Sequence, residues 1–218
     1  MKGAYALCLH AFEENIDSDF DKRHWFSYGQ FDQMLDLLSF NNFKFVSMEN
    51  VLTDQIEGTK NILITLDDGR ASILTAYEKI LKPRKILPVL AIITGFIDGS
   101  FLTWEQIQYL QHSGCHIASH GCNHIRHATL SNEDLQKELI GSKQILEQKL
   151  KPPITTYVYP YGSLMVRAEL LTCAGYTVAF ALRDGLINWS SNFLALPRYS
   201  LDQLSWQQTI DRIIKGSN

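Results

Sequence analysis

The stretch Asn61-Ile-Leu-Ile-Thr-Leu-Asp67-Asp68-Gly69 indicates the fold class. Its first six residues are almost continuously apolar, which is typical of a strand buried on both faces of a parallel sheet or barrel. Two carboxylates follow where the strand ends, and α/β enzymes place their catalytic groups at the carboxyl ends of strands. Gly69 permits the turn that lets both carboxylates face one centre. A loop that only caps the following helix is the alternative interpretation.

Further apolar runs alternate with helical patterns along the whole chain. We expect strands at residues 5–9, 43–47, 61–66, 87–94, 115–119, 155–159 and 177–182, with a weaker one at 193–199. We expect helices at residues 28–39, 71–81, 103–112, 131–150, 163–174 and 205–215. About seven such βα units favour an α/β fold, as a distorted (β/α)7-type barrel rather than a doubly wound sheet. Residues 1–218 are expected to form a single domain.

The composition excludes several classes of protein. The chain has 218 residues, of which 45% are hydrophobic and 20% charged, so it can bury a complete core and is not disordered. A net charge of −3 provides no broad basic field, and we expect no nucleic-acid partner. No apolar run reaches the roughly 18 residues of a membrane span. The apolar run near the N-terminus is too short for a signal peptide, which favours a cytoplasmic protein over one whose leader has been removed.

A second polar segment, Ser119-His120-Gly121-Cys122-Asn123-His124, also follows a predicted strand. Histidines four residues apart on one helical turn can bind a single metal ion. One aspartate from the first turn would complete a three-ligand set and leave positions open for water and substrate. A single histidine is more commonly structural, and Cys122 is an alternative soft ligand. The chain's four cysteines are otherwise expected to be reduced and mostly buried thiols.

A third segment, Thr155-Thr-Tyr-Val-Tyr159-Pro160-Tyr161-Gly162, is a strand that ends in a rigid turn. Alone it is compatible with a simple aromatic-rich strand end. The three segments in this order resemble the polysaccharide deacetylase family (NodB-homology domains, carbohydrate esterase family 4). Its Thr-Phe-Asp-Asp-Gly motif corresponds to residues 65–69, its His-(Ser/Thr)-x-x-His motif to residues 120–124, and its Tyr-Pro-Tyr-Gly motif to residues 159–162. The resemblance spans nearly the whole chain.

The resemblance implies a role for each polar residue of these motifs. Asp68, His120 and His124 would bind a divalent metal, with zinc expected first and Co²⁺ or Ni²⁺ as alternatives. Asp67 would be the general base that takes a proton from the attacking water. By family analogy, the backbone N–H of Tyr161 would help to stabilise the oxyanion.

A general acid must protonate the departing amine. Many family members supply a histidine from a Leu-x-His motif near the C-terminus, but no histidine follows His127 here. Leu7-Cys8-Leu9-His10 resembles the rearranged subgroup that includes the poly-N-acetylglucosamine deacetylases, in which the histidine comes from the first strand. His10 is therefore the expected acid. The alternative is an incidental histidine at a strand end.

Three positions depart from the family motifs. Leu66 replaces a phenylalanine, and Gly121 replaces the usual Ser or Thr between the histidines. Val158 stands where an arginine that helps to position the base often precedes the third motif. The segment Leu196-Pro-Arg198-Tyr199 resembles the family's late arginine-bearing strand, so Arg198 is the expected substitute.

The function implied is removal of an N-acyl group, expected to be acetyl, from an amino sugar in a glycan or glycoconjugate. One alternative is a deformylase or deacetylase of a nucleotide-linked or lipid-linked sugar in the cytosol. Another is a carbohydrate-binding pseudoenzyme without turnover, and the four intact residues Asp67, Asp68, His120 and His124 argue against it.

Overall fold

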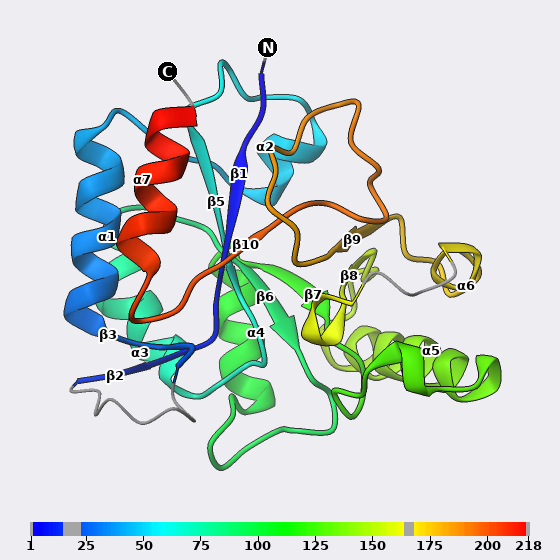
Figure 1. The fold of residues 1–218 in the computed structure, drawn as a ribbon. Helices are drawn as coiled ribbons and strands as arrows, with labels where there is room; N and C mark the ends of the chain where they lie inside the picture. The colour runs from blue at the N-terminus through cyan, green and yellow to red at the C-terminus, as the bar shows by residue number, and fades with distance from the viewer. Residues whose placement is uncertain (1, 15–22, 164–167, 217–218) are drawn as a thin grey trace.

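A computed structural model describes residues 2–14, 23–163 and 168–216 of the chain. Within these residues eight strands form one sheet, whose main path runs β10-β1-β5-β6-β7-β8-β9, with β4 pairing to β5. All the ladders in this sheet are parallel, and Figure 1 shows that it curls into an open barrel. The strands are β1 (Tyr5–Leu9), β4 (Lys44–Phe45), β5 (Asn61–Leu66), β6 (Val89–Ile92), β7 (His116–Ser119), β8 (Thr156–Val158), β9 (Val178–Phe180) and β10 (Tyr199–Ser200). The prediction of a single-domain distorted (β/α) barrel is confirmed.

The centre of the barrel is the β1–β5 pair, whose predicted limits match the structure. Every residue of both strands is buried, as continuous apolar runs require. Their register pairs Cys8 with Thr65 and Leu9 with Leu66, so the two strands end level with each other. His10 and Asp67 therefore leave the sheet at the same edge.

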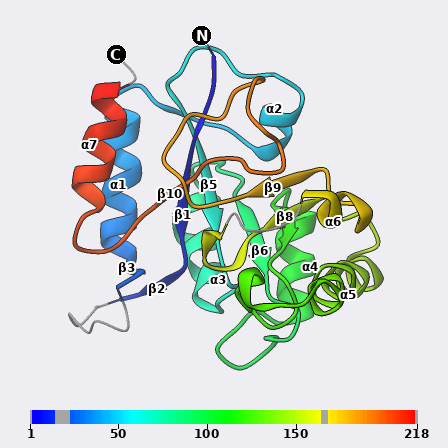
Figure 2. The ribbon, with the colours of Figure 1, turned by 45° about the vertical axis from the view of Figure 1, so that its right-hand side comes forward.

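The last predicted strand, residues 193–199, contacts both β9 and β1. Only Tyr199 and Ser200 are paired as a strand, against β1. Upstream, Leu196 exchanges backbone hydrogen bonds with β9, donating to the Ala179 carbonyl and accepting from the Ala181 N–H. Pro197 interrupts the ladder because it has no N–H to donate. Arg198 thus lies between Leu196, which bonds to the β9 segment, and Tyr199, which pairs with β1. Figure 2 shows the chain passing through this region into β10 beside β1.

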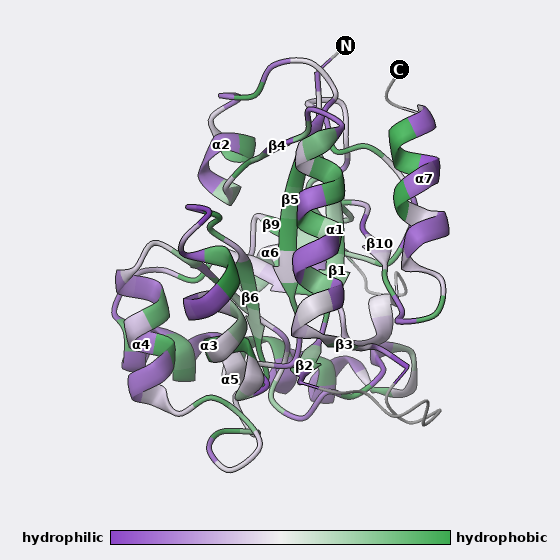
Figure 3. Cartoon of the chain, turned by 90° about the vertical axis from the view of Figure 1, so that its left-hand side faces the viewer, coloured by the Kyte–Doolittle hydropathy of each residue, from purple (hydrophilic) through white to green (hydrophobic). Residues whose placement is uncertain are grey.

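Helices cover the outside of the barrel, and each uses its apolar side. On α7, hydrophobic and hydrophilic residues lie on opposite sides, and the hydrophobic side faces α1 (Figure 3). Ser27 begins α1 with a capping box that includes Gln30, and Thr103 begins α4 in the same way with Gln106. The longer helices are α1 (Tyr28–Phe40), α4 (Trp104–His112), α5 (Asn132–Leu150) and α7 (Trp206–Gly216). None of the helices in the described residues is both long and apolar enough to span a membrane.

Several elements differ from their predicted limits. The predicted helix 71–81 divides into α3 (Ser72–Ala76) and a π-helical turn, η2 (Tyr77–Leu81). The predicted strand 43–47 is cut to two residues because Ser47 caps a short helix that the sequence analysis missed, α2 (Met48–Leu52). A second small sheet, β2 (Ala11–Glu13) with β3 (Trp25–Ser27), was also missed. The helix predicted at 163–174 is described only as α6 (Ala168–Cys173), since residues 164–167 lie outside the described residues.

Short 3-10 turns complete the element order. They are η3 (His127–Thr129) and η4 (Pro160–Gly162), and η4 is the Pro-Tyr-Gly turn predicted after the strand at 155–159. Tyr161 lies in the left-handed region of backbone space, with a φ of 57°. The turn therefore redirects the chain directly after β8, at the edge of the barrel where the polar segments gather.

Candidate active site

A pocket of about 360 Å³ opens at the carboxyl ends of the strands. That volume lies within the range of small-molecule sites. Seven segments that are distant in the sequence reach this pocket: the end of β1, the residue before β3, the turn after β5, the loop after β7, η4, the residues after β9, and β10 itself. The predicted site residues on its wall are His10, Asp67, Asp68, His120, His124 and Tyr161.

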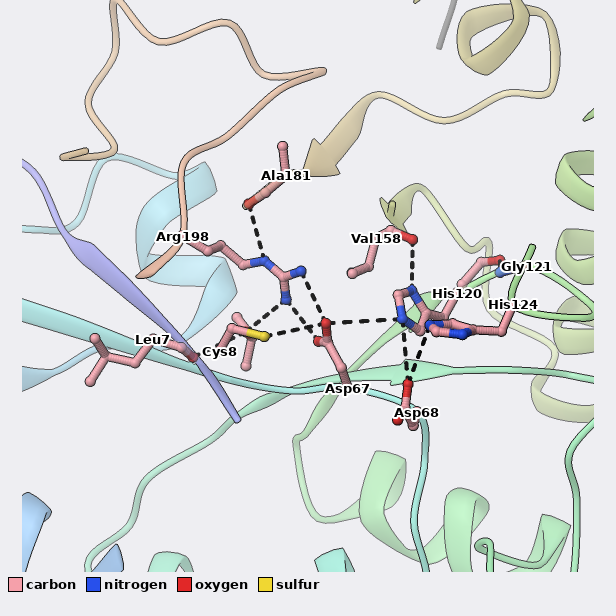
Figure 4. Close-up of polar contacts among 12 residues, drawn as sticks. Leu7, Cys8, Asp67, Asp68, His120, Gly121, His124, Val158, Ala181 and Arg198 are labelled. Carbon is pink, nitrogen blue, oxygen red and sulfur yellow. Dashed lines mark hydrogen bonds and ion pairs between the residues drawn. The ribbon is translucent and has the colours of Figure 1, made fainter. Parts of the chain in front are cut away.

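The turn after β5 brings both carboxylates to one pocket, as expected from the sequence, but gives them different surroundings. Asp68 and Gly69 both have φ near +70°, so the chain reverses direction directly after Asp67. Asp67 consequently points into the protein, where it is 3% exposed, whereas Asp68 is only partly buried. The two side chains have different neighbours, shown in Figure 4.

Asp68 faces the two histidines of the 120–124 segment. Its Oδ1 atom is 3.6 Å from Nε2 of His120 and 3.6 Å from Nε2 of His124. These separations are too long for direct hydrogen bonds, and this buried Oδ1 has no hydrogen-bond partner. Two ligand atoms about 2.0–2.2 Å from one tetrahedral ion are roughly 3.3–3.6 Å apart. The three side chains therefore fit a shared divalent cation.

The orientation of His120 is set from behind by β8. Its Nδ1 atom lies 2.8 Å from the carbonyl oxygen of Val158, which can only accept a hydrogen bond. Nδ1 must therefore carry the proton, and the Nε2 lone pair is left for the centre. Burial is the main reason that the pKa of His120 is lowered, which keeps the ring neutral and suited to bind metal.

Asp67 is held by Arg198. The guanidinium donates from Nη1 to Oδ1 at 2.7 Å and from Nη2 to Oδ2 at 3.0 Å, and it also reaches the Thr65 hydroxyl. Arg198 is 1% exposed, so this is a fully buried bidentate pair. Val158, at the position of the family's motif arginine, carries no charge. Arg198 contacts Asp67 instead, as expected from the sequence.

The charge of Arg198 governs the ionisation of Asp67. Burial alone would raise the pKa of this carboxyl, but the charge of Arg198 and its hydrogen bonds outweigh that effect and lower the pKa. Asp67 is therefore ionised at neutral pH. The thiol of Cys8 donates a further contact to Oδ2 at 3.4 Å, and burial raises the pKa of that thiol well above its usual value.

His10 follows β1 and borders the same pocket. Its ring has donor atoms within 4.8 Å of those of Cys8 and Asp67, which forms a second group of potential metal ligands. Arg198 already neutralises Asp67, so that group has little need of a further cation. The Nδ1 atom of His10 is buried without a hydrogen-bond partner, and burial lowers the pKa of the ring.

Tyr161 lines the pocket beside His124. Its ring centroid is 4.5 Å from that of His124, and the guanidinium of Arg126 lies 4.2 Å above the ring. The side chain is 48% exposed, so Tyr161 forms part of the mouth of the pocket.

The sequence analysis missed two residues of the site. His24 lines the pocket, with its ring centroid 5.1 Å from that of His10. It directly precedes β3, which was not predicted. Glu138 contacts the histidine loop from α5, and nothing in the helical pattern distinguishes it from a solvent-exposed glutamate. Cys122, considered as an alternative ligand, instead has its sulfur 3.7 Å from the Glu138 carbonyl on α5. All four cysteines are free; two are buried, one is partly buried and Cys173 is exposed.

Comparisons with known proteins agree with the fold and the motifs. The chain is 26% identical over 149 residues to YxkH of Bacillus subtilis, a protein named for polysaccharide deacetylase activity. The match covers 66% of this chain and 53% of YxkH, so the chain spans about half the length of that relative.

Solved structures share the complete fold. The deacetylase PplD of Streptococcus pyogenes, solved with acetate, matches 98% of both chains with a TM-score of 0.83 and 19% identity. IcaB of Ammonifex degensii also matches 98% of both chains, with a TM-score of 0.84 and 24% identity. The model of the family described as polysaccharide deacetylase matches residues 54–179, which include both the Asp-Asp-Gly turn and the histidine pair. With more than half of its length matched, the chain belongs to the polysaccharide deacetylase family.

Proposed function

We propose that residues 1–218 form a metal-dependent hydrolase domain that removes an N-acetyl group from an amino sugar of a glycan or glycoconjugate. The observation that supports this most directly is the pairing of two different carboxylates in one pocket. Asp67 is ionised and clamped by Arg198, while Asp68 converges with two imidazoles on one point. This arrangement separates a proton acceptor from a set of metal ligands.

Asp68, His120 and His124 would hold the divalent ion, which we propose to be zinc. When bound, such an ion acts as a Lewis acid and makes water a better nucleophile near neutral pH. The imidazole of His120 is already oriented for this task by the Val158 carbonyl. Three protein ligands leave room for water and for the substrate carbonyl.

Asp67 would accept the proton of the attacking water. Its carboxylate is ionised at neutral pH, and the bidentate contact with Arg198 fixes its orientation, so no reorganisation is required before proton transfer. His10 would give a proton to the leaving amine from the other side of Asp67. Burial lowers the pKa of His10, so the ring is neutral at rest and would have to take up the proton that it then passes to the amine. The backbone N–H of Tyr161, in the turn after β8, would stabilise the oxyanion.

A substrate screen with metal control tests this function. The purified protein is supplied with zinc and offered N-acetylated amino sugars as free oligomers and as nucleotide or lipid conjugates, and released acetate or formate is measured. We expect acetate release from a glycan oligomer that stops with chelator and returns with zinc. Preference for a nucleotide or lipid conjugate would support the alternative function, a deformylase or deacetylase of a linked sugar. The cytoplasmic location would then remain a prediction. Protein that binds no zinc and hydrolyses none of these compounds would exclude an enzyme and favour a carbohydrate-binding pseudoenzyme.

A further inference from the structure

The loop that carries His124 is held along one side by main-chain contacts. The N–H of His120 donates to the Ile92 carbonyl at 2.8 Å. The carbonyl oxygens of Gly121 and Cys122 accept from the N–H groups of Thr94 and Gly95, at 3.1 and 2.9 Å. These bonds extend the β6–β7 ladder beyond the strands and do not depend on side chains.

On the opposite side of the same loop, the Gly121 N–H donates to the Ser119 hydroxyl at 3.3 Å, and the next two residues bond to the side chain of Glu138. One carboxylate oxygen, Oε2, accepts the N–H of Cys122 at 2.8 Å and the N–H of Asn123 at 3.0 Å. The other, Oε1, accepts from the side-chain amide of Asn123 at 2.5 Å. Glu138 is 6% exposed and forms no ion pair within the described residues. Cys122 and Asn123 therefore satisfy the hydrogen bonds of the buried carboxylate, which would be costly to leave unpaired away from water.

The backbone of this loop is one that requires such support. His124 has a φ of 54°, in the left-handed region that residues with a side chain seldom adopt. In this conformation its Nε2 atom faces Oδ1 of Asp68. A loop without its anchor would be free to relax to ordinary backbone angles, and the ring of His124 would then turn away from Asp68.

Gly121 is the residue that lets the carboxylate come so close. Its φ is 81°, and a Cβ at this position would lie 3.0 Å from Oε2 of Glu138 and 3.3 Å from the Tyr157 hydroxyl. This is the position where the family motif has Ser or Thr. The absence of a side chain at Gly121 thus makes room for the carboxylate of Glu138, which holds the loop.

We propose that Glu138 is a positioning residue for the candidate metal centre, which it maintains by holding the N–H groups of Cys122 and Asn123. The inference rests on the proposed function, since it assumes that Asp68, His120 and His124 bind the ion. It assigns to α5 a role in metal affinity, although no residue of this helix belongs to the ligand set.

Zinc titration of the metal-free protein tests the proposal. We expect Glu138→Ala to weaken zinc binding about 10- to 100-fold, the usual effect of losing a partner behind the ligands. Glu138→Gln keeps an acceptor oxygen but turns an amide towards Asn123. Its zinc affinity should therefore lie between those of the unaltered protein and Glu138→Ala. Glu147→Ala is the matched control, because Glu147 lies on the same helix and accepts the Ile154 N–H at 2.9 Å without touching the loop. It should bind zinc as the unaltered protein does.

A second measurement needs no metal. Hydrogen exchange at the amides of Cys122 and Asn123 should become faster in metal-free Glu138→Ala and in Glu138→Gln, and should not change in Glu147→Ala. Glu138 variants with unaltered zinc affinity and unaltered exchange would overturn the proposal. If even the unaltered protein fails to bind zinc, the proposed function fails, while the exchange rates still decide whether Glu138 anchors the loop. If Glu138→Ala does not fold, Glu138→Gln provides both measurements.

Discussion

His116 and His120 lie at opposite ends of β7, and their immediate surroundings are similar. Each ring has one nitrogen 2.8 Å from an oxygen on β8, the Thr156 hydroxyl for His116 and the Val158 carbonyl for His120. Burial lowers the pKa of both rings. The difference is in the second nitrogen. That of His120 faces the carboxylates of Asp67 and Asp68, whereas burial is the whole cause of the His116 shift, with no charged partner.

The two ends of this strand show that residue type and burial do not identify a metal ligand. The carboxyl end of β7 lies beside the turn after β5, where Oδ1 of Asp68 has no hydrogen-bond partner. At the amino end, the ring of His116 bonds to the hydroxyl of Thr156. What distinguishes His120, the proposed ligand, is that it lies where several strand ends converge on one pocket, as expected for enzymes built on parallel strands.

The largest expected effect comes from removing each histidine in turn. His120→Ala should lose bound zinc and at least about a thousandfold in activity, because several kcal/mol of transition-state stabilisation disappear with the ion. His116→Ala should retain its zinc and most of its activity. Metal analysis together with acetate release measures both. Equal losses in the two variants would mean that β7 contributes structure alone.

Asp67→Asn tests the division of labour between the two carboxylates. We expect activity to fall about 10²- to 10⁴-fold while zinc remains bound, because the proton acceptor is lost and the ligand set is intact. Asp68→Asn should weaken zinc binding instead. If Asp67→Asn lost its zinc, or kept its rate, the assignment of base and ligand would be wrong.

Arg198 is expected to matter for stability as well as for chemistry. Arg198→Ala leaves the Asp67 carboxylate buried without its partner, which should cost about 3–5 kcal/mol of unfolding free energy. The control is Arg212→Ala, which breaks the exposed pair with Asp184 and should cost less than about 1 kcal/mol. Denaturant unfolding measures both. A loss for Arg198→Ala no larger than for Arg212→Ala would show that Asp67 finds another cation.

A third histidine, His10, sharpens the contrast because it belongs to the pocket and not to the ligand set. His10→Ala should slow turnover about a hundredfold and leave the zinc content unchanged, as expected for loss of a proton donor. Steady-state rates and metal analysis on the same sample provide the test. A variant with normal turnover would mean that another group protonates the amine.

The smallest expected effect is on stability at mildly acid pH. Burial lowers the pKa of His116 from 6.5 to about 4, so the unfolded chain binds a proton more readily than the folded one. Stability must therefore fall as the pH drops from about 6.5 to about 4, by less than about 3 kcal/mol because His116 is only partly buried. His116→Gln should have a shallower pH dependence of unfolding than the unaltered protein. Identical slopes would show that the ring of His116 is not the group that titrates.

Local sequence was sufficient for the parts of the site that lie directly after strands. The apolar runs of β1 and β5 and the polar residues that follow them are contiguous, so both the element and its end are visible in the sequence. The β2–β3 sheet and α2 were missed because each is only three to five residues long and has no clear periodicity. His24 was missed with them.

Contacts across the barrel were less accessible to prediction. The resemblance to the family suggested Arg198, but its bidentate geometry depends on the ladder that places residues 196–200 between β9 and β1. Glu138 had no comparable signal. It lies on a helix whose pattern allows a glutamate at any exposed position, and only the packing of α5 against the loop after β7 buries its carboxylate.

The bond between Asp67 and Arg198 also has a consequence for how the protein is made. The two residues are 131 positions apart, so a ribosome releases the carboxylate long before its partner exists. Until then, packing β5 against its neighbours means burying an unpaired charge, which is strongly unfavourable. This cost disfavours closure of this end of the barrel until the last strand emerges. The candidate active site would therefore be among the final parts to assemble.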